Sequence, residues 1–320
     1  ADNLAVRGVL QRWGRERGRH LVVTAIEHEA VLATAAGLED AGEATVTVVG
    51  CDRQGRVDPA AVAAAVREDT VLVSVMLANN EIGTVQDVAA VGRAVRSRNP
   101  ATFVHTDAVQ ALGRIPVAVD DIGADLLSLS AHKCHGPKGV GLLYARWGTH
   151  LRAQAEGGGQ ERGRRSGTEN VAGIVGFAVA AGLVTAEGAA RMLGLRTLLE
   201  ELAGAIPGVR VAAAGASRLP NIATLLVDGA ATDAVLTALD LRGLAVSGGS
   251  ACSSGAVRES HVVRAIGEDP RRTAVVRCSL GRDTTEEEVR EAVRRITGVC
   301  AGAGCFDAVE AAPGGRTARV

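Results

Sequence analysis

The sequence contains very few aromatic side chains and almost no net charge. Its 320 residues include three Phe, two Trp and one Tyr, too few for the stacking platforms on which single-stranded nucleic acids bind. The formal net charge of −1 gives no electrostatic attraction to nucleic acid or to an anionic membrane. We therefore expect neither nucleic acid nor membrane among the partners of the protein.

Long apolar runs and paired cysteine motifs are also missing. The longest apolar run covers residues 171–184, which is shorter than the roughly 20 residues of a membrane-spanning helix, so we expect a buried helix there. The six cysteines form no CxxC pair and no zinc-type spacing. Without a recognisable secretion signal, a chain of this size is expected to keep its thiols reduced in the cytoplasm.

Lysine is nearly absent. Of the 35 Lys and Arg residues, only Lys133 and Lys138 are lysines. An arginine guanidinium cannot lose its proton in a protein, whereas a lysine amine can. Either the two lysines occur by chance, or at least one is kept because a neutral amine is needed.

Short apolar segments alternate with helical patterns over the first half of the sequence. We expect strands at 21–26, 46–49, 71–77, 102–106, 125–130 and 141–145, with helices at 28–40, 59–67 and 87–98. Such alternation is typical of an α/β protein with a mostly parallel sheet covered on both faces. After Pro207, strand-like segments at 221–227 and 274–280 alternate with helical ones and predict a smaller α+β unit.

The sequence thus predicts three parts. Residues 1–190 form a large cofactor-binding domain, and residues 191–300 form a small C-terminal domain. Residues 301–320, rich in Gly and Ala, form a flexible tail.

Polar clusters follow three of the expected strands, at residues 79–81, 105–110 and 128–133. The carboxyl ends of parallel strands meet at one edge of a sheet, where α/β proteins bind ligands. The three clusters are therefore expected to lie close together and to form the functional site.

Each cluster also has an ordinary structural explanation. Asn79 and Asn80 fit a turn, and Asp107 with Gln110 fits a helix capping box. His132 fits a histidine held in a core or a loop. Taken one at a time, the clusters leave both interpretations open.

Taken together, the clusters contain the groups that pyridoxal phosphate catalysis requires. A lysine amine forms a Schiff base, an acid pairs with the pyridine nitrogen, and hydroxyl and imidazole donors hold the phosphate. Lys133 is one of the two rare lysines, and an arginine could not form the imine. The basic segment 164–168 precedes an expected helix whose N-terminus favours a phosphate, or else it is a solvated turn.

Cys252 lies in a run of Gly and Ser residues, 247–255. A structural cysteine usually sits among apolar neighbours, whereas a mobile, exposed thiol suits a nucleophile. We expect Cys252 to react and the other cysteines to be structural or incidental. These are Cys51, Cys134, Cys278, Cys300 and Cys305.

Seven segments carry a resemblance to a known family. They are EHEAVL (27–32), NNEIG (79–83), HTDAVQ (105–110), SAHKCHGPKG (130–139), GGGQERGRRSGT (157–168), GSACSSG (249–255) and RCSLGR (277–282). In order and spacing they are similar to the pyridoxal-phosphate-dependent cysteine desulfurases of the NifS/IscS type, in the class V aminotransferase family. The resemblance runs from Asp2 to about Val299 and implies the aspartate aminotransferase-like fold of pyridoxal-phosphate-dependent transferases.

The resemblance implies a role for each matching residue. Lys133 would bind pyridoxal 5'-phosphate covalently, His28 would stack on its ring and assist proton transfer, and Asp107 would pair with the ring nitrogen. Further cofactor contacts would come from Asn80, Gln110, Ser130, His132 and Thr168. Of these, Thr168 would reach the phosphate in the neighbouring subunit of a homodimer.

The substrate site and the nucleophile follow from the same resemblance. Arg277, with Asn80, would bind the substrate carboxylate. Cys252 would take the sulfur of L-cysteine as a persulfide and leave L-alanine. The persulfide would pass to an iron–sulfur scaffold or another acceptor protein in the cytoplasm. No metal site is firm, although Cys252 could serve as a transient iron–sulfur ligand through its persulfide.

Two alternatives and two departures from the family pattern stay open. The chain could be another class V enzyme, such as a selenocysteine lyase or an aminotransferase, or an inactive fragment that acts as a binding partner. The family has a Gly-Ala-Thr phosphate loop directly before the residues matching Asp2 and Asn3, so we expect an N-terminal truncation and weakened cofactor binding. The tail after Val299 does not resemble the scaffold-docking extension of the family, which leaves the sulfur acceptor undetermined.

Overall fold

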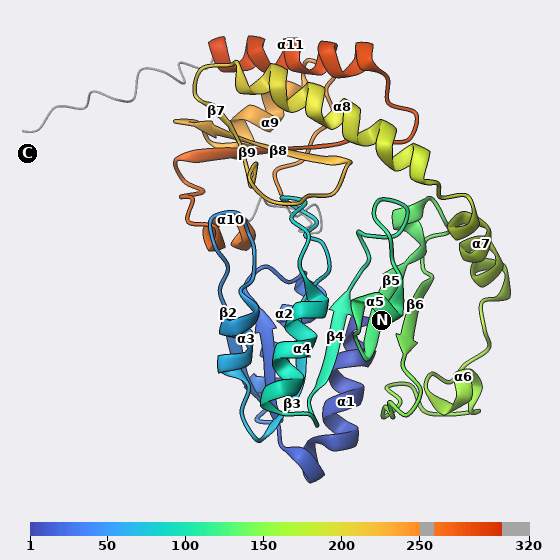
Figure 1. The fold of residues 1–320 in the computed structure, drawn as a ribbon. Coiled ribbons are helices and arrows are strands. Elements are labelled where there is room, and N and C mark those ends of the chain that lie inside the picture. Colours follow the sequence, from blue (N-terminus) through green and yellow to red (C-terminus); the bar gives the residue numbers. More distant parts are fainter. Residues whose placement is uncertain (250–258, 303–320) are drawn as a thin grey trace, which may run out of the picture.

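Two sheets organise the chain in the computed structural model, which describes residues 1–249 and 259–302 (Figure 1). The described residues form a larger sheet in the order β2-β1-β3-β4-β5-β6 and a smaller one in the order β7-β8-β9. The larger sheet contains β1 (His20–Thr24), β2 (Thr45–Val49), β3 (Thr70–Ser74), β4 (Phe103–Asp107), β5 (Leu126–Ser130) and β6 (Gly141–Ala145). Its first five strands are parallel and only β6, beside β5, is antiparallel, which confirms the mostly parallel sheet.

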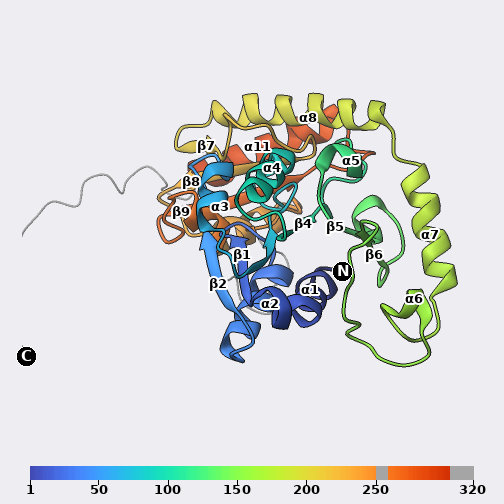
Figure 2. The same cartoon turned by 60° about the horizontal axis from the view of Figure 1, so that its bottom comes forward.

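Helices cover both faces of the larger sheet (Figure 2). On one face, α1 (Asp2–Arg17) and α2 (Glu29–Asp40) pack on a cluster that includes Leu21 and Leu72. The other face is covered by α3 (Pro59–Ala65) and α4 (Val88–Arg98). Since side chains alternate along a strand, an uninterrupted apolar run such as that of β3 supplies both cores.

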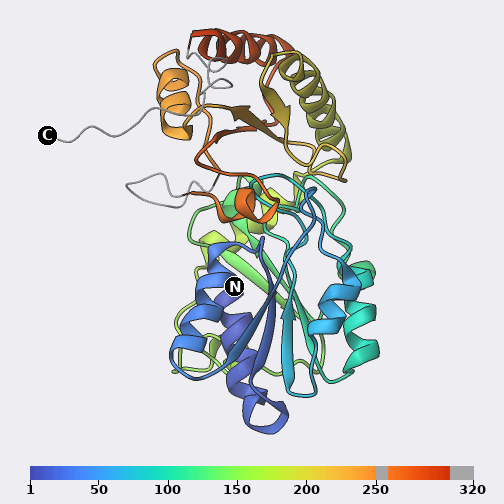
Figure 3. The same cartoon turned by 90° about the vertical axis from the view of Figure 1, so that its left-hand side faces the viewer.

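The smaller sheet is antiparallel and also uses both faces. It contains β7 (Val209–Val211), β8 (Ile222–Asp228) and β9 (Thr273–Ser279), with α8 (Ala186–Gly204), α9 (Thr232–Asp240) and α11 (Glu286–Gly302) on its outer face. Leu226 and Val275 point the other way and join the core of the larger sheet. The short α10 (His261–Ala265) lies at this junction (Figure 3) and contributes Val262 and Val263 to the shared core. The domain division at residue 190 stays a prediction, and α8, which spans that residue, packs on the smaller sheet.

The expectation of a buried helix at 171–184 is wrong. The segment forms α7 (Val171–Gly182), beside the edge of the larger sheet (Figure 1). Only Gly173, Phe177 and Ala180 are buried, and Phe177 and Ala180 pack against η1 (Ala131–Cys134). The helix is apolar all round but has a neighbour on one side only, so most of its large side chains are exposed. These are Val171, Ile174, Val175 and Val179.

Two shorter helices complete the described part of the chain, α5 (Val119–Ile122) and α6 (Gln160–Gly163). Over the described ranges, no single helix is both long and apolar enough to cross a membrane. The bent pair of α7 and α8 meets the length and composition criteria jointly.

Candidate active site

Four segments meet at the carboxyl edge of the larger sheet. They follow β1, β3, β4 and β5, which are consecutive neighbours in the sheet, and parallel strands end at the same edge. The segments carry Glu27 and His28, then Asn79 to Glu81, then Asp107, then Ser130 to Lys133. This edge faces the smaller sheet (Figure 1). The topology therefore brings together the predicted residues of four separate motifs.

Lys133 lies in η1 and is half-buried. Its positive charge adds to the lowering of the pKa of His28 by burial and partly offsets the rise in the pKa of Asp107, so the amine is within electrostatic reach of both groups. The backbone carbonyl of Lys133 accepts a hydrogen bond from Arg114 Nη2 at 2.9 Å, which fixes the main chain below the amine. The structure thus places these three predicted residues at one site.

His28 is the N-cap of α2, and this fixes its ring. Its Nδ1 accepts a hydrogen bond from the Ala30 N–H at 3.1 Å, so Nδ1 carries no proton. Burial, chiefly, holds the pKa of His28 below its usual value. A neutral imidazole with a fixed tautomer is suited to accept or return a proton near pH 7.

Asp107 ends β4 and is 5% exposed. Its Oδ1 accepts the Val109 N–H at 2.9 Å, while burial first and the nearby Asp2 second raise its pKa to about 7. Gln110 lies in a turn and its carbonyl accepts from Arg114, so the capping-box interpretation is wrong. A cationic partner would lower the pKa of this buried carboxyl group and stabilise its ionised form.

Ser130 and His132 provide polar groups beside Lys133. Ser130 Oγ and His132 Nδ1 share a hydrogen bond of 2.7 Å, and the His132 ring is exposed. Thr168 is exposed on the segment between α6 and α7, which is not one of the four segments that follow the strands. Its role toward a neighbouring subunit stays a prediction.

Arg277 reaches the edge from β9 of the smaller sheet. Its Nη1 donates to the Asn80 carbonyl at 2.8 Å, and its backbone pairs with that of Ser247. Asn79 is a turn residue, as one interpretation held, because its Oδ1 accepts the N–H groups of Glu81 and Ile82. Asn80 and Arg277 therefore lie together where the two sheets meet.

Known proteins resemble this chain over most of its length. The family model for aminotransferase class-V matches residues 1–291. The chain belongs to that family. It is 46% identical over 307 residues to the cysteine desulfurase IscS of Anaeromyxobacter sp., covering 92% of this chain and 74% of that protein. It is 42% identical over 302 residues to the cysteine desulfurase IscS of Azotobacter vinelandii, covering 92% and 73%.

Solved structures of the same group have the same fold. A NifS-like protein superposes with a TM-score of 0.85 at 37% identity, covering 93% of this chain and 79% of that one. A structure of SspA in complex with cysteine gives 0.75 at 32% identity, covering 89% and 79%. The expected family, the cysteine desulfurase type and the α/β fold are thereby confirmed.

Cys252, the predicted nucleophile of this family member, lies outside the described residues, as does Cys305. The chain is described up to Gly249 and again from Glu259.

Two buried acids at the site were missed by the sequence reasoning. Glu27 is fully buried and accepts hydrogen bonds from the Thr24 hydroxyl at 2.6 Å and the Met76 N–H at 2.7 Å. Burial, chiefly, raises its pKa to about 8. Asp2, at the start of α1, has Oδ1 at 3.7 Å from His105 Nε2. Glu27 was part of a quoted motif, but its partner Met76 lies too far along the sequence to reveal its role.

The residues at this edge fit pyridoxal phosphate. Glu27 Oε2 and Asp2 Oδ1 are buried and accept no hydrogen bond from any described residue, and Asp107 lies within electrostatic reach of both acids. A protonated ring nitrogen would give the buried Asp107 carboxyl group a cationic partner. The amine of Lys133 and the donors at Ser130 and His132 complete the required set of groups.

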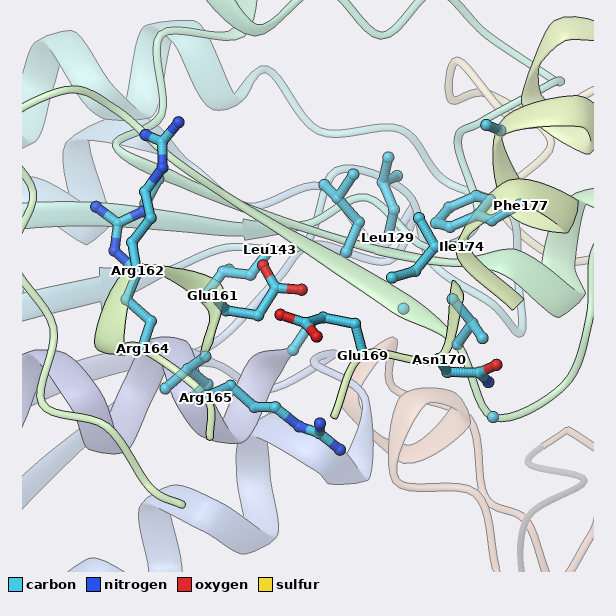
Figure 4. A pocket seen from close by; sticks show the side chains of 18 of the residues that line it. Leu129, Leu143, Glu161, Arg162, Arg164, Arg165, Glu169, Asn170, Ile174 and Phe177 are labelled. Carbon is cyan, nitrogen blue, oxygen red and sulfur yellow. The ribbon is translucent and has the colours of Figure 1, made fainter. Parts of the chain in front are cut away.

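A cavity of about 870 Å³ lies between β6 and α7. Figure 4 shows its apolar wall, with Leu143, Ile174 and Phe177, and its charged rim, with Glu161 and Arg164. Lys133, His28 and Asp107 are not among its lining residues. Arg164 and Arg165, from the basic segment predicted to favour a phosphate, line this second space instead.

Proposed function

We propose that this protein is a pyridoxal-phosphate-dependent cysteine desulfurase, which converts L-cysteine to L-alanine and keeps the sulfur as a persulfide on Cys252. The observation that carries the proposal is the placement of the Lys133 amine within electrostatic reach of both His28 and Asp107. The relatives at 42–46% identity are named cysteine desulfurases, which supports the same assignment.

Five residues besides Lys133 are proposed to hold the cofactor. Asp107 pairs with the ring nitrogen, and Ser130 and His132 bind the phosphate. Gln110 and Asn80 complete the ring contacts. When bound, pyridoxal phosphate supplies an electron-withdrawing ring that stabilises negative charge at the substrate Cα.

Lys133 and His28 are proposed to handle the protons. The Lys133 amine takes the proton from the substrate Cα, and the neutral His28 ring lies close enough to share in its return. Because Nδ1 of His28 accepts the Ala30 N–H, Nε2 is the ring nitrogen that we propose for this exchange.

Arg277 is proposed to orient the substrate. A planar guanidinium binds a carboxylate through two parallel hydrogen bonds, and Nη1 of Arg277 is held by the Asn80 carbonyl. This bond supports a binding position for the substrate carboxylate between the two sheets.

The sulfur transfer balances without an external oxidant. The Cys252 thiolate attacks the substrate sulfur, an S–S bond forms, and the Cβ–S bond breaks. Its electron pair stays on Cβ, which takes a proton and becomes the methyl group of alanine. The carbon gains two electrons and each sulfur loses one, so the products are L-alanine and a Cys252 persulfide.

The persulfide is proposed to pass to an iron–sulfur scaffold or another sulfur-acceptor protein, and the working form is proposed to be a homodimer. The exposed position of Thr168 is consistent with a donor that serves a neighbouring subunit. A persulfide carrier requires a reducing compartment, which supports a cytoplasmic location.

The proposal is tested with the full chain, pyridoxal phosphate and L-cysteine, by measuring alanine, released sulfide and the mass of the Cys252 peptide. Lys133→Ala should abolish alanine formation, and Cys252→Ser should abolish both alanine and persulfide. The matched controls Lys138→Ala and Cys51→Ser should retain the parent rates. A Cys252→Ser variant that releases sulfide at the parent rate would contradict the persulfide step. If the protein were instead an aminotransferase, Cys252→Ser would leave its turnover unchanged.

A further inference from the structure

Glu81 is a buried carboxyl group that the proposed chemistry does not use. It follows Asn80 in the segment after β3 and is 1% exposed. The Ser260 hydroxyl donates to its Oε2 at 2.5 Å, and no described residue donates to its Oε1. Burying a carboxyl group is costly unless it is well bonded, so its position needs an explanation.

Glu81 also contacts the residue at which the described chain stops before Cys252. A Cβ atom on Gly249 would lie 2.6 Å from Glu81 Oε2 and 3.4 Å from Ser260 Cβ. The main chain of Gly249 therefore packs directly on the carboxyl group, with a φ of +105° that glycine adopts readily. Gly249 and Ser260, which flank the segment containing Cys252, meet at one oxygen atom.

The chain on either side of these two residues is tied to the active-site loops. Before Gly249, Ser247 and Arg277 exchange backbone hydrogen bonds of 3.1 and 2.6 Å. After Ser260, His261 Nε2 bonds to the Glu27 carbonyl at 2.9 Å, one residue before His28. Ser260 also caps α10 by accepting the Val263 N–H at 3.0 Å. The chain before Gly249 is therefore bonded to Arg277, the proposed substrate-binding residue. The chain after Ser260 is bonded next to His28, which is proposed to move protons.

The segment that carries Glu81 is itself fixed between the two sheets. The Glu81 carbonyl accepts the Thr224 hydroxyl of β8 at 2.5 Å, and the Asn80 carbonyl accepts from Arg277. The main chain that carries Glu81 is therefore bonded to both β8 and β9, which makes its carboxyl group a suitable anchor for the residues on either side of the Cys252 segment.

We propose that Glu81 is a positioning residue for sulfur transfer, which accepts the Ser260 hydroxyl and packs on Gly249 and so holds the two ends of the Cys252 segment at the substrate site. This inference rests on the proposed function, since it assigns Cys252 as the nucleophile. Fixing both ends of a chain segment raises the effective concentration of a group within it. Without the tie, substrate should bind normally while the thiol meets the substrate sulfur less often.

The variants are Glu81→Ala, Glu81→Gln and Ser260→Ala, with Glu259→Gln as the matched control. Glu259 is exposed and pairs with Arg264 and Arg271, so its loss removes a neighbouring carboxylate without touching Glu81. Three quantities are measured: L-cysteine affinity from the change in cofactor absorbance, the single-turnover rate of alanine formation, and amide hydrogen exchange of residues 259–265 without cofactor.

Glu81→Ala and Ser260→Ala should slow alanine formation about ten-fold or more, keep L-cysteine affinity within about two-fold, and speed exchange at residues 259–265. Glu81→Gln, which keeps an oxygen acceptor for Ser260, should lie between parent and Glu81→Ala. Should Glu81→Ala fail to fold, Ser260→Ala gives the same comparison.

Two results would overturn the inference while the proposed function stands: unchanged alanine formation in Ser260→Ala, or an equal loss of L-cysteine affinity and rate. A parent enzyme that forms no alanine from L-cysteine would instead overturn the proposed function, and this inference with it.

Discussion

The carboxyl edge of the parallel strands and the flank formed by β6 and α7 differ in how their side chains are held. The polar groups of the edge are hydrogen-bonded, whereas the apolar groups of the flank are largely exposed. At the edge, polar groups such as His28, Asp107 and Glu27 are held by hydrogen bonds from the backbone of their own or neighbouring loops. On the flank, Val175 and Val179 are 56% and 58% exposed although the helix is almost wholly apolar. The position of a chemical group is thus set locally, whereas the burial of an apolar helix depends on what packs against it.

The largest effect should come from removing the charge at the edge. Asp107→Asn keeps the acceptor for the Val109 N–H but cannot balance a protonated ring nitrogen, so pyridoxal phosphate binding should weaken by roughly 100-fold to 1000-fold. A fluorescence titration with pyridoxal phosphate measures this. The exposed Asp120→Asn serves as control. Affinity within two-fold of the parent would show that Asp107 is not the partner of the ring.

On the flank, stability should depend on which side of α7 is changed. Phe177→Ala removes the one large buried side chain of the helix and should lower the free energy of unfolding by about 3 kcal/mol. Val175→Ala, on the exposed side, should stay within about 0.5 kcal/mol. Urea denaturation followed by circular dichroism compares them. Equal losses would mean that the exposed face is covered in solution.

The smallest effect concerns pH. Burial raises the pKa of Glu27 to about 8 and that of Asp107 to about 7, so the folded chain keeps protons that the unfolded chain loses near pH 4. Stability from such groups is complete at low pH and is lost as pH rises through the folded pKa. Above about pH 7 the buried histidines, whose pKa values are lowered, are mostly neutral in the unfolded chain as well, so they oppose this trend only weakly.

Without cofactor, the free energy of unfolding should therefore fall between about pH 7 and 8, by up to about 1.4 kcal/mol per pH unit for each group. Glu27→Gln should flatten the part between pH 7 and 8, and the exposed Glu43→Gln should not. An unchanged slope in Glu27→Gln would indicate that Glu27 is already ionised in the folded protein.

The difference between local placement and packing of distant elements also explains what the sequence alone could predict. Asp107 and Lys133 were found because each follows a recognisable strand, and His28 was found through the resemblance to the cysteine desulfurases. Strand order then brings the three residues to one edge. Glu81 was in a quoted motif but received no role, since its partner Ser260 is 179 positions away. Such a contact comes from the packing of the two sheets, and no local pattern reveals it.

The error at α7 has a related cause. An apolar run of helical length indicates a helix, but it does not state how many of its sides are covered. Asn79 shows the reverse case, where a turn signal was local and the structure follows it. The meeting of the strand ends at one edge was predictable, and the contacts that depend on how the two sheets pack were not.

The most direct test of the central claim uses the two lysines. The chain is incubated with pyridoxal phosphate and reduced with borohydride, which fixes the cofactor to any amine that holds it, and the labelled peptides are identified by mass spectrometry. We predict the label on Lys133 and not on Lys138, with no label on residue 138 in a Lys133→Ala variant. Label on Lys138 alone, or shared equally between the two lysines, would contradict the assignment of Lys133 as the cofactor-binding residue at the carboxyl edge.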